Sequence, residues 1–235
     1  MLVASLSPMA LAVPIGEDTV SEFIAGDLDE FDATLEGNQY MFTNDDEPVF
    51  SASSYLKKQW VEAGYPNLIL PFSESYSNSR SSARNCTNAW SQGDTDTIPT
   101  ASGTVDATVQ KISTNSAIFV QNGQVIPATT LNDIASTFET TIFPIDTTYF
   151  GTPPDVDNNC QVEIVIIAMD GAGGIGGYFS PGIASSRESV FIDADDMDWR
   201  NTILSHELEH LLHNARDPYE HLWIDEGAAD MAAYL

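Results

Sequence analysis

Lysine and arginine are scarce in this chain. Its 235 residues include 8 Lys and Arg against 35 Asp and Glu, which gives a formal net charge of −27. Proteins hold nucleic-acid phosphates with clustered Lys and Arg, so this composition argues against a nucleic-acid partner. The same sign disfavours binding to an anionic membrane surface. The excess of acidic residues indicates a strongly solvated surface, as in proteins that work in salty water, where self-repulsion is screened. Recognition of a cationic substrate is the alternative.

Cysteine and long apolar runs are also limited. Cys86 and Cys160 are the only cysteines, which excludes a CxxC zinc site and a disulfide-dense scaffold but leaves one long-range disulfide open. No run of 18 apolar residues occurs, so no segment is expected to span a bilayer. Apolar residues still make up 43% of the chain, which is enough for a globular core.

The composition changes along the chain and suggests three regions. Residues 1–13 are small and apolar, and Ala10-Leu11-Ala12 resembles a signal-peptidase site, so we expect a signal peptide or its remnant and an exported protein. A frayed or buried N-terminal segment is the alternative. Residues 14–100 are acidic, with a serine-rich loop at 73–82, and are interpreted as an N-terminal extension or pro-region. An ordered domain is expected over 101–235.

A hairpin and a helix are predicted in the middle of the chain. Asn122-Gly123 lies between apolar runs, and both residues tolerate the positive φ of a tight turn, so we expect a hairpin over 118–126. Apolar residues then recur at helical spacing over about 130–142, with Thr130 and Asp133 resembling a capping box at the start.

Two short β-branched stretches predict strands. Residues 162–168 are almost continuously apolar, which is typical of a strand buried on both faces, and residues 189–193 form a further strand. Residues 171–177 are rich in glycine and are expected to form a loop.

All four histidines fall between positions 206 and 221, and the first two belong to an HExxH motif formed by His206, Glu207 and His210. In a helix, positions i and i+4 lie about 40° apart on one face, so the two imidazoles can bind one tetrahedral zinc ion. Glu207 is turned by about 100° from His206 and can reach a zinc-bound water as general base.

The sequence around the motif supports a helix. Neither Pro nor Gly occurs between residues 197 and 213. Acidic residues at the expected start favour the helix dipole, and leucines on the face opposite the histidines can dock the helix into a core. These residues are Asp195, Asp196 and Asp198 at the start, and Leu204, Leu208 and Leu211 on the docking face.

A second motif offers a third ligand. Glu226 follows His210 by 16 positions, after a break at Asp217-Pro218. Asp225 is suited to cap a second helix, on which Glu226 and Asp230 share one face. Glu226 could then bind the metal, and Asp230 could accept the N–H of a metal-binding imidazole and fix its tautomer.

The two motifs, HELEH and DEGAAD, resemble those of the gluzincin metallopeptidases of the thermolysin-like clan. The stretch from Ile112 to Leu235 is similar to the hyicolysin-like secreted branch, including Phe150-Gly151, the turn at 155–159 and the segment 176–181. The metzincin pattern does not fit, because His213 and Arg216 stand where it requires Gly and a third ligand.

The resemblance implies an α+β, zincin-like fold, with a twisted, mostly antiparallel or mixed sheet over the active-site helix. It also implies an edge strand that binds substrate by strand addition, for which Gly176–Ser180 is the candidate, with Gly177, Tyr178 and Phe179 contacting substrate. A simple glycine-rich turn is the alternative for this segment. The chain continues for nine residues after Glu226, so a short or truncated C-terminal helical lobe is expected.

The resemblance also implies roles for individual residues. Two further side chains, Tyr219 and His221, are candidates for stabilising the oxyanion, and His213 is expected to pack beside the ligands rather than to bind the metal. The zinc ligands implied are His206, His210 and Glu226, with Glu207 as general base. Asp230 is implied to accept the N–H of one of the zinc-binding histidines.

An acidic turn is the preferred interpretation of Asp155, Asp157, Asn158 and Asn159, and a Ca²⁺ site made of their oxygen atoms is the alternative. The sequence as a whole predicts an exported zinc endopeptidase that acts on peptides or proteins. The rival is a non-catalytic, metallopeptidase-like zinc-binding module of a surface or adhesion protein. A closed fourth metal ligand, for which His213 is the candidate, would favour this rival, because a catalytic zinc keeps one position for water.

Overall fold

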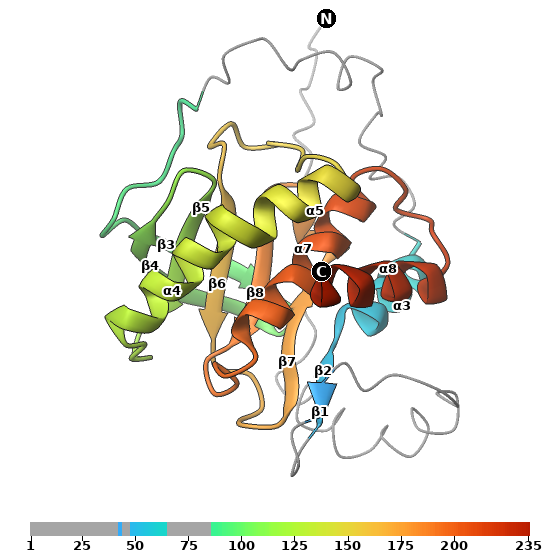
Figure 1. Cartoon of the computed structure of the whole chain (residues 1–235), viewed down its shortest axis with the longest axis horizontal. Helices are drawn as coiled ribbons and strands as arrows, with labels where there is room; N and C mark the ends of the chain where they lie inside the picture. Colours follow the sequence, from blue (N-terminus) through green and yellow to red (C-terminus); the bar gives the residue numbers. More distant parts are fainter. Residues whose placement is uncertain (1–41, 44–47, 65–85) are drawn as a thin grey trace, which may run out of the picture.

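The structure is a computed structural model that describes residues 42–43, 48–64 and 86–235. In these residues the chain folds as an α+β protein around one mixed sheet of eight strands (Figure 1). The α+β class and the mixed sheet expected from the sequence are therefore confirmed. The signal-like residues 1–13 and the serine-rich stretch 73–82 lie outside the described residues.

The strands are joined in the order β1-β2-β7-β8-β6-β5-β4-β3. The β2–β7, β5–β6 and β6–β8 pairs are parallel, and the other pairs are antiparallel. The strands span Phe42–Thr43 (β1), Pro48–Ser51 (β2), Thr95–Thr100 (β3), Gly103–Ile112 (β4), Ser116–Gln121 (β5), Val162–Ile167 (β6), Gly174–Phe179 (β7) and Ser189–Asp193 (β8).

Helices α4 and α7, with the π-helical turn η2, pack on one face of the sheet, and α8 packs beside α7 (Figure 1). Helix α3 contacts β7 and α6. The helices span Ser53–Glu62 (α3), Ala128–Thr137 (α4), Phe138–Ile142 (η2), Phe143–Tyr149 (α5), Pro181–Ala184 (α6), Arg200–Asn214 (α7) and Leu222–Tyr234 (α8).

Strand β6 is buried on both faces, as its unbroken apolar sequence predicts. Ile164 and Ile166 belong to the core under α4 and α7, whereas Val165 and Ile167 belong to a second core on the opposite face. Side chains alternate across a strand, so a strand between two cores carries apolar residues at every position. The parallel neighbours β5 and β8 are buried in the same way.

Helix α7 is a central helix that contacts β7, β8 and α8. Every residue from Ile203 to Leu212 is buried. The helix begins at Arg200, so Asp195, Asp196 and Asp198 precede its first turn instead of occupying it.

Two expectations for the region 118–142 are corrected. Gly123 makes a turn with φ 98°, but Val125 is 89% exposed and no strand follows, because Pro127 leads directly into α4. The antiparallel partner of β5 is β4, not residues 124–126. The helix over 130–142 is confirmed but begins at Ala128, so Thr130 is already inside it and caps nothing.

The glycine-rich stretch is partly strand. Gly174 and the residues after it form β7, so the loop predicted over 171–177 ends before Gly174. The segment expected as a substrate-binding edge strand is extended, as predicted, but it is not at an edge, because β2 pairs with it on the side away from β8.

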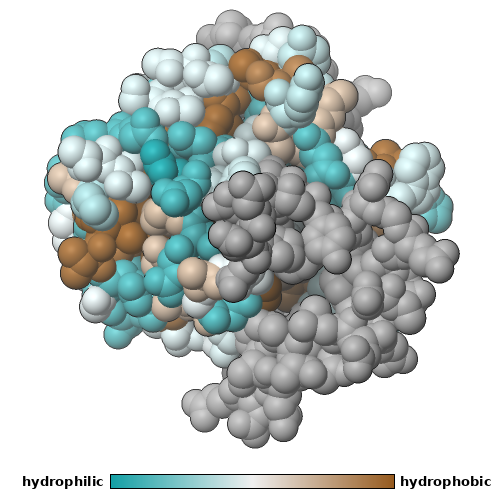
Figure 2. Space-filling view, turned by 60° about the horizontal axis from the view of Figure 1, so that its bottom comes forward, coloured by the Kyte–Doolittle hydropathy of each residue, from teal (hydrophilic) through white to brown (hydrophobic). Residues whose placement is uncertain are grey.

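Cys86 and Cys160 form a disulfide, which joins the start of the third described segment to the turn before β6. None of the described helices is long and apolar enough to span a membrane. On the face shown in Figure 2, the described surface is mainly hydrophilic or neutral, with separate apolar patches, as the strongly negative charge leads one to expect.

Candidate metal centre

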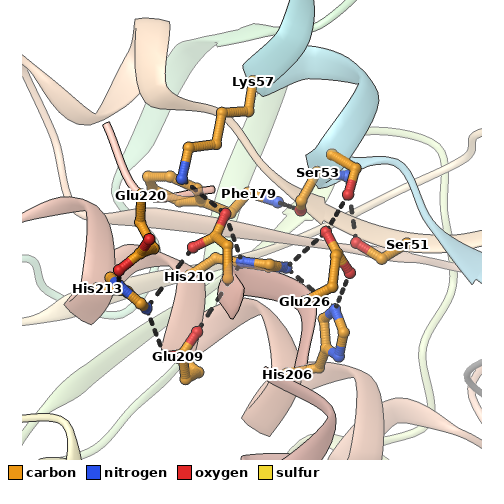
Figure 3. Close-up of polar contacts among 12 residues, drawn as sticks. Ser51, Ser53, Lys57, Phe179, His206, Glu209, His210, His213, Glu220 and Glu226 are labelled. Carbon is orange, nitrogen blue, oxygen red and sulfur yellow. Dashed lines mark hydrogen bonds and ion pairs between the residues drawn. The ribbon is translucent and has the colours of Figure 1, made fainter. Parts of the chain in front are cut away.

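Helices α7 and α8 bring three potential metal ligands to one point. His206 and His210 project from successive turns of α7, and their Nε2 atoms are 3.0 Å apart. Glu226, in the second turn of α8, places one carboxylate oxygen 3.4 Å from His206 Nε2 and the other 3.5 Å from His210 Nε2. The two histidines are buried, and the Glu226 side chain is 23% exposed. These three side chains could hold a metal ion between α7 and α8 (Figure 3).

The separations suit a tetrahedral ion. Ligand atoms about 2.0–2.1 Å from zinc at tetrahedral angles lie roughly 3.3 Å from one another. The atoms of His206, His210 and Glu226 that face one another are separated by 3.0 to 3.5 Å. If each imidazole carries its proton on Nδ1, the two Nε2 lone pairs and the Glu226 carboxylate face one another, and a bound cation would stabilise this group of acceptors.

The Nδ1 atoms face carboxylates on α8. Nδ1 of His206 lies 3.4 Å from Asp230 Oδ1, the relationship that the spacing of α8 predicts. Nδ1 of His210 lies 3.5 Å from Asp225 Oδ2. Acceptors behind the imidazoles favour protonation of Nδ1 and leave Nε2 free to bind a metal.

The expected role of Asp225 as a helix cap is wrong. Helix α8 begins earlier, at Leu222, with His221 at its N-cap, so Asp225 lies inside the first turn and is buried. Its carboxylate faces His210 and makes a 2.8 Å ion pair with Lys57, which is also buried. The sequence motif placed Asp225 beside the ligand Glu226 but did not show that it faces the other histidine.

The electrostatics of the cluster favour positive charge. Burial by itself lowers the pKa of His210, but the carboxylates of Glu226 and Asp225 outweigh it and raise the pKa to about 10. For the Asp225 carboxyl, burial by itself raises the pKa. The nearby His210 and Lys57 outweigh burial and lower the pKa of Asp225 to about 2. A site with this excess of carboxylate is suited to a divalent cation.

Glu207 lies beside the cluster and is fully buried. Its Oε2 accepts a 2.6 Å hydrogen bond from Ser53 Oγ. Ser53 Oγ in turn accepts a 2.8 Å hydrogen bond from the N–H of Phe179, and both of these residues are labelled in Figure 3. Its Oε1 has no hydrogen-bond partner among the described residues. A carboxylate with one free, buried oxygen next to a metal position is able to accept a proton from a bound water.

The residues from α3 were not found by the sequence patterns. Ser53 contacts Glu207, the Ser54 hydroxyl donates to Glu226, and Lys57 pairs with Asp225. No spacing in the sequence links these residues to the motifs, because they meet only through the pairing of β2 with β7.

The candidate substrate residues lie in β7. Gly177 sits so close to α7 that a Cβ atom there would be 2.5 Å from Ile203 and 3.5 Å from Glu207. Phe179 reaches the site through its N–H, while the ring of Tyr178 stacks on Phe191 in the second core and its hydroxyl accepts a bond from Ala101 N–H. Tyr178 therefore packs against the core on the other side of the sheet.

The remaining candidates lie outside the metal cluster. His213 places Nδ1 3.1 Å from Glu209 Oε1 and is not one of the three converging side chains. Tyr219 is 49% exposed and stacks on Trp60 at 6.5 Å between ring centroids. His221 is exposed at the N-cap of α8.

A second acidic cluster lies just before the first residues of β6 and β8. Asp155 and Asp157 join Glu188 in a group that could hold a metal ion. The side chain of Asn159 instead donates to Asp157, so the four-residue set suggested by the sequence is replaced by two of its members and Glu188. Glu188 Oε2 is buried without a hydrogen-bond partner among the described residues.

The chain matches no protein-family model, and no curated protein is significantly similar to it. The functional argument therefore depends on the geometry of this site.

Proposed function

We propose that this protein is a zinc-dependent endopeptidase of the gluzincin type, with a zincin-like fold. The observation that carries the proposal is the convergence of His206, His210 and Glu226 on one point, with the buried carboxylate of Glu207 beside it. A structural zinc site needs four protein ligands and no base, whereas a catalytic one has three ligands and an open position.

Zinc bound by these three side chains would polarise the scissile carbonyl and lower the pKa of a bound water to about 7. The chain supplies the proton transfers. Glu207 accepts the proton of the attacking water at its free Oε1 and delivers it to the nitrogen of the departing amine. The carboxylates of Asp230 and Asp225, at 3.4 and 3.5 Å from Nδ1 of His206 and His210, would favour a proton on each Nδ1 and leave Nε2 directed at the metal.

The substrate backbone would lie along the side of β7 that β2 occupies in this structure, next to Glu207. Gly177 lets this strand approach α7 closely, since a larger residue would collide with Ile203. Residues 174–179 present backbone groups toward this side, which is where β2 now pairs. Recognition through main-chain bonds suits a peptidase that binds extended peptides.

The alternative of a non-catalytic zinc-binding module is favoured less by the geometry. Its expected signature is a fourth protein ligand, and the candidate for that position, His213, faces Glu209 instead. Burial of Glu207 with an unpaired oxygen also has a cost that a purely structural site does not require.

Replacing the base tests the proposal directly. Glu207→Gln should retain zinc but lose peptide cleavage by about 10²-fold or more, because the amide cannot accept the proton. Glu220→Gln removes the same charge near α8 without touching the cluster, so it serves as the matched control and should cleave normally. Unchanged turnover by Glu207→Gln would remove Glu207 as the base.

The export of this peptidase is also a proposal. The disulfide between Cys86 and Cys160 suits an oxidising compartment outside the cytosol. Mass spectrometry of the protein recovered from the medium of its source cells tests this, and retention in the cell would contradict it.

The second acidic cluster is proposed to hold Ca²⁺. Hard oxygen ligands from Asp155, Asp157 and Glu188 suit that ion. Burial, together with the charges of Asp157 and Asp155, raises the pKa of Glu188 to about 8, although the Val156 N–H opposes the shift, and a divalent cation would favour the charged form. Added Ca²⁺ should raise the melting temperature of the wild type but not of Glu188→Gln. An equal rise in both proteins would place the effect elsewhere.

A further inference from the structure

The segment Pro48–Gly64 lies where an extended peptide would bind. Its strand β2 pairs in parallel with β7, with Val49 opposite Gly174 and Ser51 opposite Gly177. The Ala52 N–H extends this pairing with a 3.1 Å hydrogen bond to Gly177 C=O. Strand addition to a free edge is a general mode of peptide capture, so the chain itself occupies the edge that a substrate would use.

The start of α3 closes on the two carboxylates that the reaction needs. Ser53 Oγ donates to Glu207 Oε2 at 2.6 Å, and the next residue, Ser54, donates to Glu226 Oε1. Figure 3 shows Ser53 reaching the site from above the metal cluster. Two successive hydroxyls therefore engage the general base and a metal ligand, in the space that water and substrate would enter.

The rest of α3 anchors this contact. Lys57 and Asp225 form a 2.8 Å ion pair in which both side chains are buried. Trp60 is 8% exposed and stacks on Tyr219, and Leu56 packs against the second core. These contacts hold the segment over the site through apolar burial and a buried pair, not through surface charges alone.

We propose that Pro48–Gly64 is an autoinhibitory segment that must leave the cleft before the peptidase can act. The proposal rests on the peptidase function argued above. In one chain the segment is tethered, so it competes with substrate at a high effective concentration. A cut between residues 64 and 86 would make the contact bimolecular, while all cluster ligands and Glu207 stay on the other piece.

A substitution that loosens the segment without touching the catalytic residues tests this in the full-length protein. Leu56→Asp places a charge against the second core and should release the segment, raising kcat/KM for a peptide substrate by about tenfold or more. Val61→Asp introduces the same charge on the same helix at a position that is 54% exposed, and should leave activity unchanged. Equal activity in wild type, Leu56→Asp and Val61→Asp would overturn the inhibitory role.

A second readout separates this proposal from the peptidase proposal. Hydrogen exchange of the backbone amides of β7 should be slow in the wild type and in Val61→Asp, and faster in Leu56→Asp, because the N–H of Phe179 is bonded to Ser53. Faster exchange without any cleavage by a zinc-loaded protein would keep the occlusion and contradict the peptidase function. Unchanged exchange in Leu56→Asp, with that variant folded, would contradict the occlusion itself.

Cleavage of the tether provides the independent check where Leu56→Asp does not fold. Residues 73–82 are replaced by the recognition sequence of a specific protease, and the purified full chain is cut and diluted. Activity should rise by about 10²-fold on dilution of the cut protein. A synthetic peptide of residues 48–64 should reverse the rise, and the same peptide with Ser53→Ala and Ser54→Ala should do so less well. No rise on cutting and no inhibition by the peptide would refute the proposal.

Discussion

Asp225 Oδ2 lies 3.5 Å from Nδ1 of His210, and the same oxygen forms an ion pair with Lys57 Nζ at 2.8 Å. This carboxylate therefore links His210, a candidate metal ligand, to helix α3. The corresponding partner of His206, Asp230, is 51% exposed and shares its charge with solvent. The two histidines thus have acceptors of the same kind in different surroundings.

The difference in burial predicts different effects on metal affinity. Asp225→Asn should weaken zinc binding by about 10- to 100-fold, because His210 loses the charged acceptor that fixes its tautomer. Asp230→Asn should have a smaller effect, since that carboxylate is already solvated. Zinc affinity measured by competition with a chelator gives both values, and a larger loss for Asp230→Asn would contradict the arrangement.

Lys57 supplies the control for this comparison. Asp225→Asn also leaves the Lys57 ammonium buried without its partner, which by itself destabilises the fold. A comparison of Lys57→Met with the double variant Lys57→Met/Asp225→Asn avoids the unpaired ammonium, because neither protein contains Lys57. The zinc affinity should fall between these two proteins by the same factor as between wild type and Asp225→Asn.

Close packing of β7 on α7 predicts a sensitive glycine. Gly177→Ala would place a Cβ 2.5 Å from Ile203 Cγ2 and 2.6 Å from the Phe191 carbonyl oxygen, so it should destabilise the fold by about 1–3 kcal/mol. At Gly182 the nearest atom to a Cβ is 3.8 Å away, and Gly182→Ala should stay within about 0.5 kcal/mol of wild type. Urea unfolding measures both, and equal stabilities would contradict the contact.

The sequence predicts best what is set by local geometry. The spacing of His206 and His210 requires one helical face, and Glu226 with Asp230 requires another, and α7 and α8 provide both. The apolar runs of β6 and β8 were predicted for the same reason, because a strand buried on both faces needs apolar residues throughout.

What the sequence missed depends on long-range contacts or on a boundary shifted by a few residues. The strand expected after Asn122-Gly123 fails because Pro127 starts α4, and β5 finds its partner upstream in β4. The role of Asp225 was missed because α8 begins at Leu222, which moves Asp225 from the cap to the inner face of the helix. Ser53 meets Glu207 across 154 positions, a contact that no local pattern encodes.

The disulfide is expected to contribute substantially to stability. Cys86 and Cys160 are separated by 74 positions, and closing a loop of that length reduces the entropy of the unfolded chain by about 4 kcal/mol at 25 °C. The double variant Cys86→Ser/Cys160→Ser should lose stability of this order without losing zinc, since the bond lies away from the metal cluster. Denaturant unfolding at neutral pH measures the change, and an unchanged midpoint would contradict it.

A buried acid predicts that stability falls as the pH rises. Burial, followed by repulsion from Asp196 and Asp170, raises the pKa of Asp193 to about 7, although the N–H groups of Asp195 and Met169 oppose the shift. In the unfolded chain Asp193 has a pKa of about 3.9, so between pH 4 and 7 the unfolded chain releases a proton that the folded chain keeps. The free energy of unfolding therefore decreases from pH 4 to 7, by an amount on the order of a few kcal/mol.

Asp193→Asn isolates this contribution. Asparagine is nearly isosteric, keeps an oxygen that can accept the Met169 and Asp195 N–H groups, and has no proton to lose in this range. Its free energy of unfolding should therefore fall less steeply than that of wild type between pH 4 and 7, with the two proteins compared at each pH. Parallel curves would show that Asp193 does not titrate in this window.

The central claim is that His206, His210 and Glu226 form a zinc site. Its most direct measurement is zinc per chain by elemental analysis, on full-length protein purified without a metal-affinity tag, with Glu226→Ala beside the wild type. We predict close to one zinc per chain in the wild type and a clear loss in Glu226→Ala. A folded wild-type protein without zinc, or a variant that keeps its zinc in full, would contradict the assignment.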